Sequence, residues 1–410
     1  MAAADDDEPA SDLRASIRPT EAEIDLGAIV RNRARLQALV GQSQVWGVIK
    51  ADAYGHGAVP VARALEPDCP VLAVSLVEEG LELRAAGIAC PIIVLGAHYG
   101  RCHLEVLDAR LTPVIYDPAD IEPFAAAARR RNRVLDVHVK IDTGMSRLGL
   151  GPAQFPAALG RLRQAGGLRL AGLCTHFASP ELEDGSTRDA MAKFRPCIAE
   201  ALGRGAGGAT SVAAVPAGAT TGSSAERVWL HAANSAAAIR HPDTRLDAVR
   251  PGLVLYGATP APNVAVPGLE PALRLTTRVM AIRTIPPGTA VSYGGQWVAA
   301  RPTRVATLPV GYADGYPRHV RGAEVLVRGR RCPVIGAVCM DMLMIDVTDV
   351  MAGPGAASGE VSVGDRVTLL GAQGADAISV DELARAAGTI NYEILCGISK
   401  RVPRVYKRTA

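Results

Sequence analysis

A regular alternation of short apolar runs with helix-length segments constrains the fold of this chain more than any other feature. Near-continuous apolar strands separated by helices indicate a parallel sheet that helices cover. Eight strands within about 240 residues match the size of a (β/α)8 barrel of the TIM type. An open, doubly wound sheet is the alternative, but no Gly-x-Gly-x-x-Gly follows the first run. The eight apolar runs cover residues 45–49, 71–77, 91–97, 112–116, 134–141, 168–177, 228–233 and 248–256.

Changes in composition and periodicity along the sequence predict where domains begin and end. Residues 1–17 are small and acidic, and we expect a disordered tail. Residues 18–265 form the predicted barrel, interrupted at 204–225 by a flexible insertion made almost entirely of Gly, Ala, Ser, Thr and Pro. From 266 to 410 strand-like runs follow one another with Gly/Pro turns and few helices, which predicts a mostly-β C-terminal domain.

Two helices carry signals at both of their ends. The first begins after Asp25, a suitable N-cap, and stops at Gly41. The second covers residues 380–387, with Asp381 as its expected N-cap and Gly388 as its stop.

Composition excludes several classes of function. A net charge of +3 over 410 residues, with no basic run among aromatics, argues against a nucleic-acid partner. The eight cysteines form no Cys-x-x-Cys pair and no histidines cluster at metal spacing, which favours a reducing compartment and no metal. The acidic N-terminus lacks an apolar signal core, and no window approaches 18 apolar residues. We expect a cytoplasmic protein whose partners are small molecules or a second copy, with no membrane association.

The first apolar run delivers Lys50 at its C-terminal end, followed by Tyr54 and a turn with two glycines. Burial at a strand end lowers the pKa of a lysine and favours its neutral, nucleophilic amine. Such amines form Schiff bases with aldehydes such as pyridoxal phosphate. Taken alone, a solvated surface lysine is the stronger interpretation, because most lysines are exposed.

The fifth run alternates strictly, so that His138, Lys140 and Asp142 share one face and apolar residues the other. Apolar residues facing the helices would place the three polar side chains inside the barrel. The glycine-bearing loop that follows returns Arg147 to the same end. Active sites of these barrels lie at the C-terminal ends of the strands, so this end is the expected site.

Three later runs add polar residues at the same barrel end. The sixth run carries His176 near its end, the seventh leads from His231 to Ser235, and the eighth has Arg250 near its start. Ser235 could cap a helix and present its N-terminus to a phosphate. Each residue alone has an ordinary packing interpretation, and only their convergence favours a functional site.

The C-terminal domain offers the polar and aromatic stretches 291–295, 311–316 and 339–341. Composition and periodicity give no reason to prefer a functional role over structural turns for these residues.

From about residue 19 to 406 the chain resembles bacterial alanine racemases of the pyridoxal-phosphate barrel type. Matching stretches occur in order across both predicted domains, which makes the resemblance highly specific. They are 48–57, 140–149, 175–177, 231–236, 249–257, 291–294, 308–315, 339–341 and 389–393.

The resemblance implies a two-base racemisation between L-alanine and D-alanine, supplying D-alanine for peptidoglycan or catabolising it. Lys50 would hold pyridoxal 5′-phosphate as an aldimine and act as one base, and Tyr293 would reach the site from the second subunit of a head-to-tail homodimer as the other. Arg250 would face an unprotonated pyridine nitrogen, with His231 supporting it and His176 near the cofactor ring.

The resemblance also assigns residues to the phosphate and the substrate. Arg147 and the backbone at Met340 would bind the substrate carboxylate, while Tyr312 and Asp341 support the site. Lys140 matches a position often carboxylated in the family, where a carbamate would pair with Arg147. The phosphate would be held by Tyr54, Ser235, Gly252, Leu253 and Tyr392.

Alternatives remain within and beyond this family. A racemase with serine or broader substrate preference, a non-catalytic pyridoxal-phosphate-binding barrel and a related-fold decarboxylase share parts of the pattern. The C-terminal domain with Tyr293 argues against the single-barrel binding protein. Asp52 stands where many family members have Asn, and this charge beside the lysine is the main departure, together with the insertion and the tail.

Overall fold

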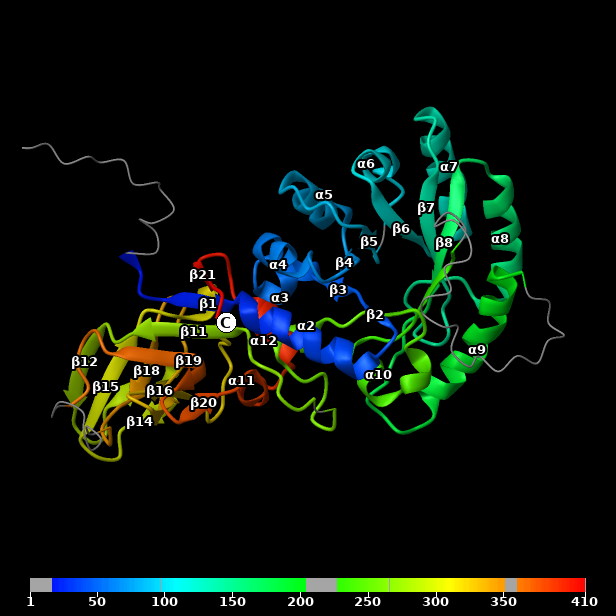
Figure 1. The fold of residues 1–410 in the computed structure, drawn as a ribbon. Coiled ribbons are helices and arrows are strands. Elements are labelled where there is room, and N and C mark those ends of the chain that lie inside the picture. Colours follow the sequence, from blue (N-terminus) through cyan, green and yellow to red (C-terminus); the bar gives the residue numbers. More distant parts are fainter. Residues whose placement is uncertain (1–16, 97, 204–226, 265, 351–359, 410) are drawn as a thin grey trace, which may run out of the picture. The chain divides into compact units, whose positions relative to one another are not determined.

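The computed structural model describes residues 17–96, 98–203, 227–264, 266–350 and 360–409 (Figure 1). The chain divides into two compact units, one formed by Ile29–Glu270 and the other by Met1–Ala28 together with Pro271–Ala410. The predicted acidic tail, apart from its last residue, and the predicted insertion at 204–225 lie outside the described residues.

The first unit is the predicted barrel. Its strands pair in parallel throughout, in the order β2-β10-β9-β8-β7-β6-β5-β4-β3. Only Trp46 separates β2 from β3. Because β2 pairs with β10 and β3 pairs with β4, these two short strands together act as one strand that closes a ring of eight. The strands are β2 (Gln44–Val45), β3 (Gly47–Val48), β4 (Leu72–Val74), β5 (Ile92–Val94), β6 (Leu111–Ile115), β7 (Leu135–Lys140), β8 (Leu168–Cys174), β9 (Trp229–His231) and β10 (Ala248–Val249).

Helices follow the barrel strands in sequence, as the alternation predicts. α7 illustrates the cause: Phe124, Ala125 and Ala128 are fully buried on one side, while Arg129 and Arg130 at its end are exposed. The helices of this unit are α2 (Leu26–Val40, which begins in the other unit), α3 (Lys50–Gly55), α4 (Ala58–Leu65), α5 (Val77–Ala85), α6 (His103–Asp108), α7 (Ile121–Arg130), α8 (Phe155–Gln164), α9 (Ser186–Ala201) and α10 (Ser235–Arg240).

Packed side chains fill the interior of the barrel, as in other barrels of this kind. Ile93, Val114, Cys174 and Ala248, from four strands of the ring, form one buried cluster with Trp46. The barrel is therefore a solid core, and chemistry belongs at its end. No helix among the described residues combines the length and apolar character that a membrane span requires.

The second unit is mostly β, as predicted. Its main sheet runs in the order β12-β15-β18-β17-β16-β19-β11-β1-β21, with β20 on β19, and β13 (Ala290–Val291) pairs separately with β14 (Trp297–Val298). The strands of the main sheet are β1 (Glu21–Asp25), β11 (Leu273–Arg278), β12 (Ala281–Ile285), β15 (Thr303–Leu308), β16 (Glu324–Val327), β17 (Arg330–Ile335), β18 (Leu343–Asp346), β19 (Arg366–Gln373), β20 (Asp376–Ile378) and β21 (Arg404–Lys407).

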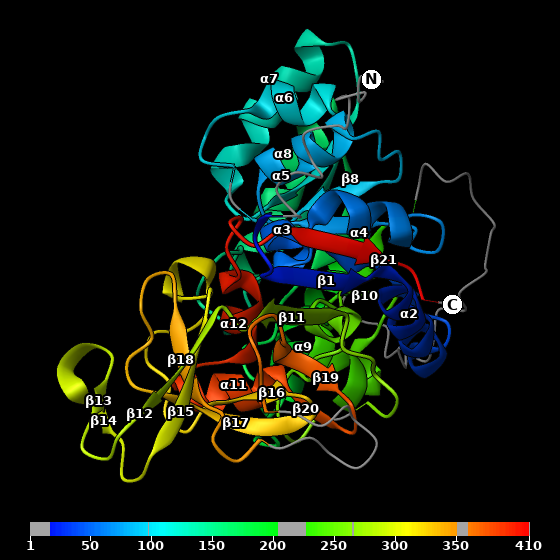
Figure 2. The same cartoon turned by 90° about the vertical axis from the view of Figure 1, so that its left-hand side faces the viewer.

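The first strand corrects the expected domain boundary. Residues 18–265 were expected to form one domain, but β1 lies between β11 and β21 of the second unit (Figure 2). Its Glu23 carboxylate accepts hydrogen bonds from Arg274, Arg366 and Lys407. Both the strand pairing and this ion cluster join residues some 250 to 380 positions apart, and local sequence patterns do not reveal such contacts.

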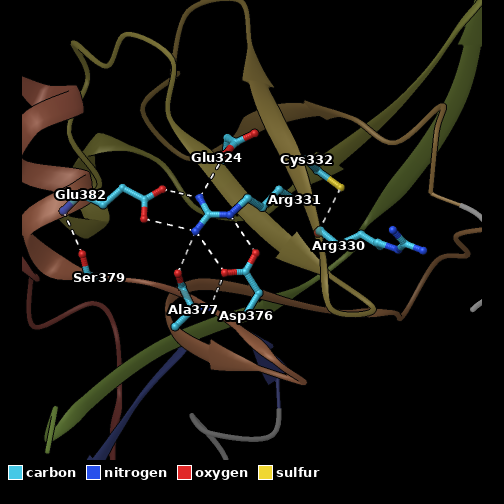
Figure 3. Close-up of polar contacts among 8 residues, drawn as sticks. All are labelled: Glu324, Arg330, Arg331, Cys332, Asp376, Ala377, Ser379 and Glu382. Atoms are coloured by element: carbon cyan, nitrogen blue, oxygen red, sulfur yellow. Dashed lines mark hydrogen bonds and ion pairs between the residues drawn. The ribbon is translucent and has the colours of Figure 1, made fainter.

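Arg331 joins four elements of this unit through a second ion cluster (Figure 3). Its guanidinium donates to Glu324 on β16, to Asp376 on β20 and to Glu382 on α11 (Val380–Ala387). Arg331 itself lies on β17 and is one-third exposed. One cation therefore ties two strands and a helix to its own strand.

The predicted helix ends are partly confirmed. Asp25 Oδ1 accepts from the Ala28 amide at 3.1 Å, and Gly388 follows α11 with φ 69°. Asp381 is not the cap of α11, because Ser379 accepts from the Glu382 amide at 3.1 Å instead. Asp381 accepts from Asn391 at the start of α12 (Asn391–Gly397), a helix that the sequence pattern did not predict.

Candidate active site

The turn that carries Lys50 is left-handed. After β3, residues Ala51, Asp52, Ala53 and Tyr54 have φ of 54, 53, 52 and 54° inside the six-residue element α3. This conformation costs an L-residue about 1–2 kcal/mol, so four in succession need support from the surrounding structure. No propensity in the sequence predicts such a turn.

Backbone and carboxylate hydrogen bonds hold part of this turn. The Ala53 amide donates to Ile49 O at 3.0 Å, and the Gly57 amide to Asp52 O at 2.9 Å. Asp52 Oδ1 accepts from the amide of Ala58, the first residue of α4, at 2.7 Å. The Asp52 carboxylate therefore fastens the turn to the next helix.

Aromatic packing supports the other side of the turn. The Tyr256 hydroxyl donates to Val48 O, two residues before the lysine, at 3.0 Å. Its ring lies 5.0 Å from the Tyr54 ring and 4.5 Å from the His56 ring, measured between centroids. Residues from the end of the barrel sequence thus fix both strand and turn around Lys50.

Arg250, directly after β10, is buried and bonded only to neutral acceptors among the described residues. Its Nη1 donates to His231 Nδ1 at 2.6 Å, and its Nη2 donates to Thr175 O at 2.8 Å and Ala232 O at 3.0 Å. Burial lowers the pKa of this guanidinium. A buried cation without a carboxylate is costly, which makes it a notable feature of the barrel end.

Two histidines extend this contact into the barrel. Because His231 Nδ1 accepts from Arg250, its proton is on Nε2, which donates to His138 Nδ1 at 2.7 Å. Burial and the charge of Arg250 lower the pKa of His138 to about 3 and hold that of His231 well below its usual range. Both rings are therefore neutral and orient the guanidinium. His138 was predicted to point inward, but the sequence did not assign it to the site.

His176 follows β8 and lies beside the Arg250 guanidinium. Burial lowers the pKa of His176 well below its usual range, and the charges of Arg250, Lys140 and Arg147 act in the same direction. Its Nδ1 is 3.5 Å from Arg250 Nη2. The structure thus brings four predicted site residues to one end of the barrel.

Lys140 ends β7 and is 8% exposed. Burial lowers the pKa of its amine, and the charges of Arg147 and Arg250 lower it further. Asp142, two residues later, directs its Oδ1 to the amides of Gly144, Met145 and Ser146 at 2.9, 3.0 and 3.1 Å. This carboxylate therefore shapes the loop that leads to Arg147.

Tyr54, Ser235 and Gly252 form a cluster of hydrogen-bonding groups. Ser235 Oγ accepts from the Gly252 amide at 3.0 Å. A Cβ on Gly252 would lie 2.1 Å from the Tyr54 hydroxyl oxygen, so a larger residue there would displace the Tyr54 ring. Leu253 follows, fully buried. Ser235 does not cap α10: Asn234 does, accepting from the Ala237 amide at 3.0 Å.

A cavity of about 220 Å³ lies beside His176. It is lined by the loop after β7, the loop after β8 and the first turns of α9, including Thr143, Met145, Thr187 and Lys193. No group of His, Cys, Asp and Glu among the described residues could hold a metal ion.

The remaining predicted site residues belong to the second unit and are largely accessible within it. Tyr293 is 70% and Met340 53% exposed, and Tyr312 is also exposed. The Tyr312 amide donates to Cys339 O at 3.1 Å, which places Tyr312 beside the stretch that carries Met340. Asp341 accepts from Arg401 at 2.7 Å.

Tyr392 lies on α12 and is half-buried. It belongs to the same unit as Tyr293 and Met340, and three of its predicted companions at the phosphate, Tyr54, Ser235 and Gly252, belong to the barrel unit.

Comparisons with known proteins cover both units. Residues 24–260 match the model of the alanine racemase N-terminal domain, and residues 272–406 match that of the alanine racemase C-terminal domain. An alanine racemase of Sorangium cellulosum is 44% identical over 95% of this chain and 100% of its own length. One from Halothermothrix orenii is 40% identical over 95% and 97%.

Solved structures of alanine racemases are also similar to this chain over most of its length. Alanine racemase from D-cycloserine-producing Streptomyces lavendulae is 34% identical with a TM-score of 0.85, covering 96% of this chain and 98% of that one. The Bacillus anthracis alanine racemase with bound L-Ala-P is also 34% identical, with a TM-score of 0.82 and coverage of 95% of each chain.

Proposed function

The chain belongs to the alanine racemase family, and on that premise we propose that it interconverts L-alanine and D-alanine with pyridoxal 5′-phosphate as cofactor. The observation that carries the proposal is the match of both family domains across the chain, with the Lys50 turn and the Arg250 network at one end of the barrel. We also propose a cytoplasmic role, either supplying D-alanine for peptidoglycan or catabolising it.

The residues of the barrel end fit this cofactor. Tyr54, Ser235 and the Gly252–Leu253 backbone supply hydroxyl and amide groups suited to a phosphate, and we propose Tyr392 as a further contact. Lys50 would supply the amine for the aldehyde. His176 lies beside Arg250, and we propose both as neighbours of the cofactor ring. The cofactor, when bound, supplies an electron sink that acidifies the substrate Cα–H bond.

Arg250 supports a particular electronic state of the cofactor. A guanidinium has only donors and stays protonated, so Arg250 would pair with an unprotonated ring nitrogen. His231, held neutral, fixes the orientation of that donor. A weaker electron sink shortens the lifetime of a carbanion and favours return of the proton, which suits racemisation rather than transamination.

Racemisation requires proton transfer on two opposite faces of the substrate carbon. We propose Lys50 as the base on one face and Tyr293 of the partner subunit in a homodimer as the base on the other. The 70% exposure of Tyr293 within its own unit is consistent with a contact to a second chain. Positioned acid–base groups of this kind contribute roughly 10²–10⁴ each in rate.

For the substrate carboxylate we propose Arg147 and the backbone at Met340, with Tyr312 and Asp341 as supporting residues. We further propose that Lys140 is carboxylated. Burial lowers the pKa of the Lys140 amine and so favours the neutral form, which is nucleophilic toward CO₂. Attack on CO₂ with loss of the amine proton to solvent would give a carbamate anion that pairs with Arg147.

The test is a racemisation assay in both directions with purified protein and added cofactor, on alanine, serine, lysine and arginine. We expect alanine to be the best substrate and Lys50→Ala to abolish turnover from either isomer. Tyr293→Phe should mainly impair solvent-deuterium exchange from L-alanine. A colourless, inactive protein with Lys50 intact after reconstitution would refute the proposal, and equal loss of exchange from both isomers in Tyr293→Phe would refute the two-base assignment.

A further inference from the structure

We propose that Glu79 on α5 is a positioning residue for Lys50, an inference that rests on the proposed function. Glu79 Oε1 accepts from the amide of Ala51, the residue after the lysine, at 2.6 Å. Its Oε2 accepts from the amides of Ser75 at 2.7 Å and Leu76 at 3.0 Å. One carboxylate therefore joins the lysine turn to the exit of the neighbouring strand β4.

The position of Glu79 in α5 accounts for the bond between its Oε2 and Leu76, but not for the bond between its Oε1 and Ala51. It is the third residue of α5, where a glutamate commonly bonds back to the N-cap amide, here that of Leu76. That ordinary role uses a single oxygen. The other oxygen leaves the helix and bonds a residue of the preceding strand–helix unit, which helix capping does not require.

The bond to Ala51 acts at the point that orients the lysine. Ala51 is the first of the four residues with positive φ, and its amide belongs to the peptide plane that joins it to Lys50. Because a peptide group is planar, fixing this N–H fixes the plane on the C-terminal side of Lys50. The Lys50 side chain leaves the backbone next to that plane, so the carboxylate limits where the amine can lie.

A glutamine at this position separates the proposed role from simple packing. The three amides need two acceptor oxygens, and the side chain of glutamine has one acceptor and one donor of nearly the same shape. In either orientation of the amide, Glu79→Gln sets an NH₂ group against an N–H. Glu78→Gln is the matched control, since Glu78 is its exposed neighbour on the same helix.

The experiment titrates each apo-protein with pyridoxal 5′-phosphate and follows both the yellow absorbance and the visible circular dichroism of the bound cofactor. We expect Glu79→Gln to bind the cofactor about tenfold more weakly, the scale of losing a hydrogen bond to a charged group. Its dichroism per bound cofactor should be reduced, because that signal reports ring orientation, whereas Glu78→Gln should match the wild type. Unchanged affinity and dichroism in Glu79→Gln would overturn the inference, even if its melting temperature fell.

A second measurement covers the case in which Glu79→Gln does not fold. Residue-resolved hydrogen exchange on the wild-type protein should show the Ala51 amide protected, although Ala51 is an exposed residue. Exchange at the rate of an unprotected amide would overturn the inference. Failure of the wild-type protein to bind the cofactor would instead refute the proposed function, so the two failures are distinguishable.

Discussion

Arg250 in the barrel unit and Arg331 in the β unit place the same guanidinium in opposite surroundings. Arg331 is one-third exposed and its N–H groups bond the carboxylates of Glu324, Asp376 and Glu382. Arg250 is 6% exposed and bonds a neutral histidine and two backbone carbonyls. The first arrangement neutralises its cation and fastens secondary structure; the second orients its cation and leaves the charge available.

This contrast distinguishes charged clusters that stabilise the fold from charged groups that bind a ligand. An ion cluster that serves the fold satisfies both signs, as around Arg331, or around Glu23 with its three cationic partners. A cationic site that awaits an electron-rich ligand keeps its charge unneutralised and is supported by neutral acceptors. Three predictions, in order of decreasing effect, test whether the two kinds of cluster differ in this way.

Replacing Arg250 should have the largest effect, and the effect should be on activity. We expect Arg250→Met to lower kcat for alanine racemisation by about 10²–10³, the range for removal of one preorganised donor. Steady-state kinetics in both directions measures it, with Arg331→Met as the matched control. A loss below tenfold in a folded Arg250→Met protein would show that the unneutralised charge is not functional.

Glu23 should control stability in acid. Burial raises the pKa of its carboxyl, but hydrogen bonds from Arg274 and Lys407 outweigh burial and lower it to about 2, from 4.5. A lowered carboxyl pKa gives stability that is complete above about pH 4.5 and is lost as the pH falls toward 2. We expect Glu23→Gln to lose about 2 kcal/mol of unfolding free energy at pH 7.

The measurement for Glu23 is denaturant unfolding of the wild type and Glu23→Gln between pH 7 and pH 3. The difference between the two proteins should shrink as the pH falls, because the wild-type carboxylate is progressively protonated. A difference that stays constant over this range would mean that the cations around Glu23 do not stabilise its charge.

Arg331→Met should have the smallest effect, and the effect should be on stability alone. Partly exposed ion pairs contribute little each, so we expect a loss of about 1 kcal/mol, seen as a fall of a few degrees in Tm. Added salt should restore part of the loss, because it screens the three carboxylates left facing one another. A change in kcat with this variant would contradict its structural assignment.

Local periodicity explains how much of the fold could be predicted. Each expected run overlaps a barrel strand, and helices such as α5 and α9 lie between these strands. The eighth run, 248–256, is the exception in length: only Ala248–Val249 forms a strand, and Leu253–Tyr256 forms a 3-10 helix. Alternation in β7 likewise indicated that His138 and Lys140 point inward, and both are buried. These features depend on residues a few positions apart, which a sequence displays directly.

The missed features depend on residues far apart. The left-handed turn at Lys50 is supported by Glu79 and Tyr256, and β1 is held in the second unit by partners near the C-terminus. The hydrogen bonds from Arg250 through His231 to His138 join the end of β10 to β9 and β7. Neither propensity nor spacing encodes such pairings, although a family resemblance can indicate the residues involved.

The closure of the barrel on the Gln44–Val48 stretch has a consequence for the order in which the chain acquires function. This stretch pairs through β3 with β4, about 25 residues away, and through β2 with β10, about 200 residues away. A nascent chain that ends before residue 248 has no partner for β2. Capture of the cofactor should therefore be a late event of biosynthesis, and a truncated barrel should not compete for it.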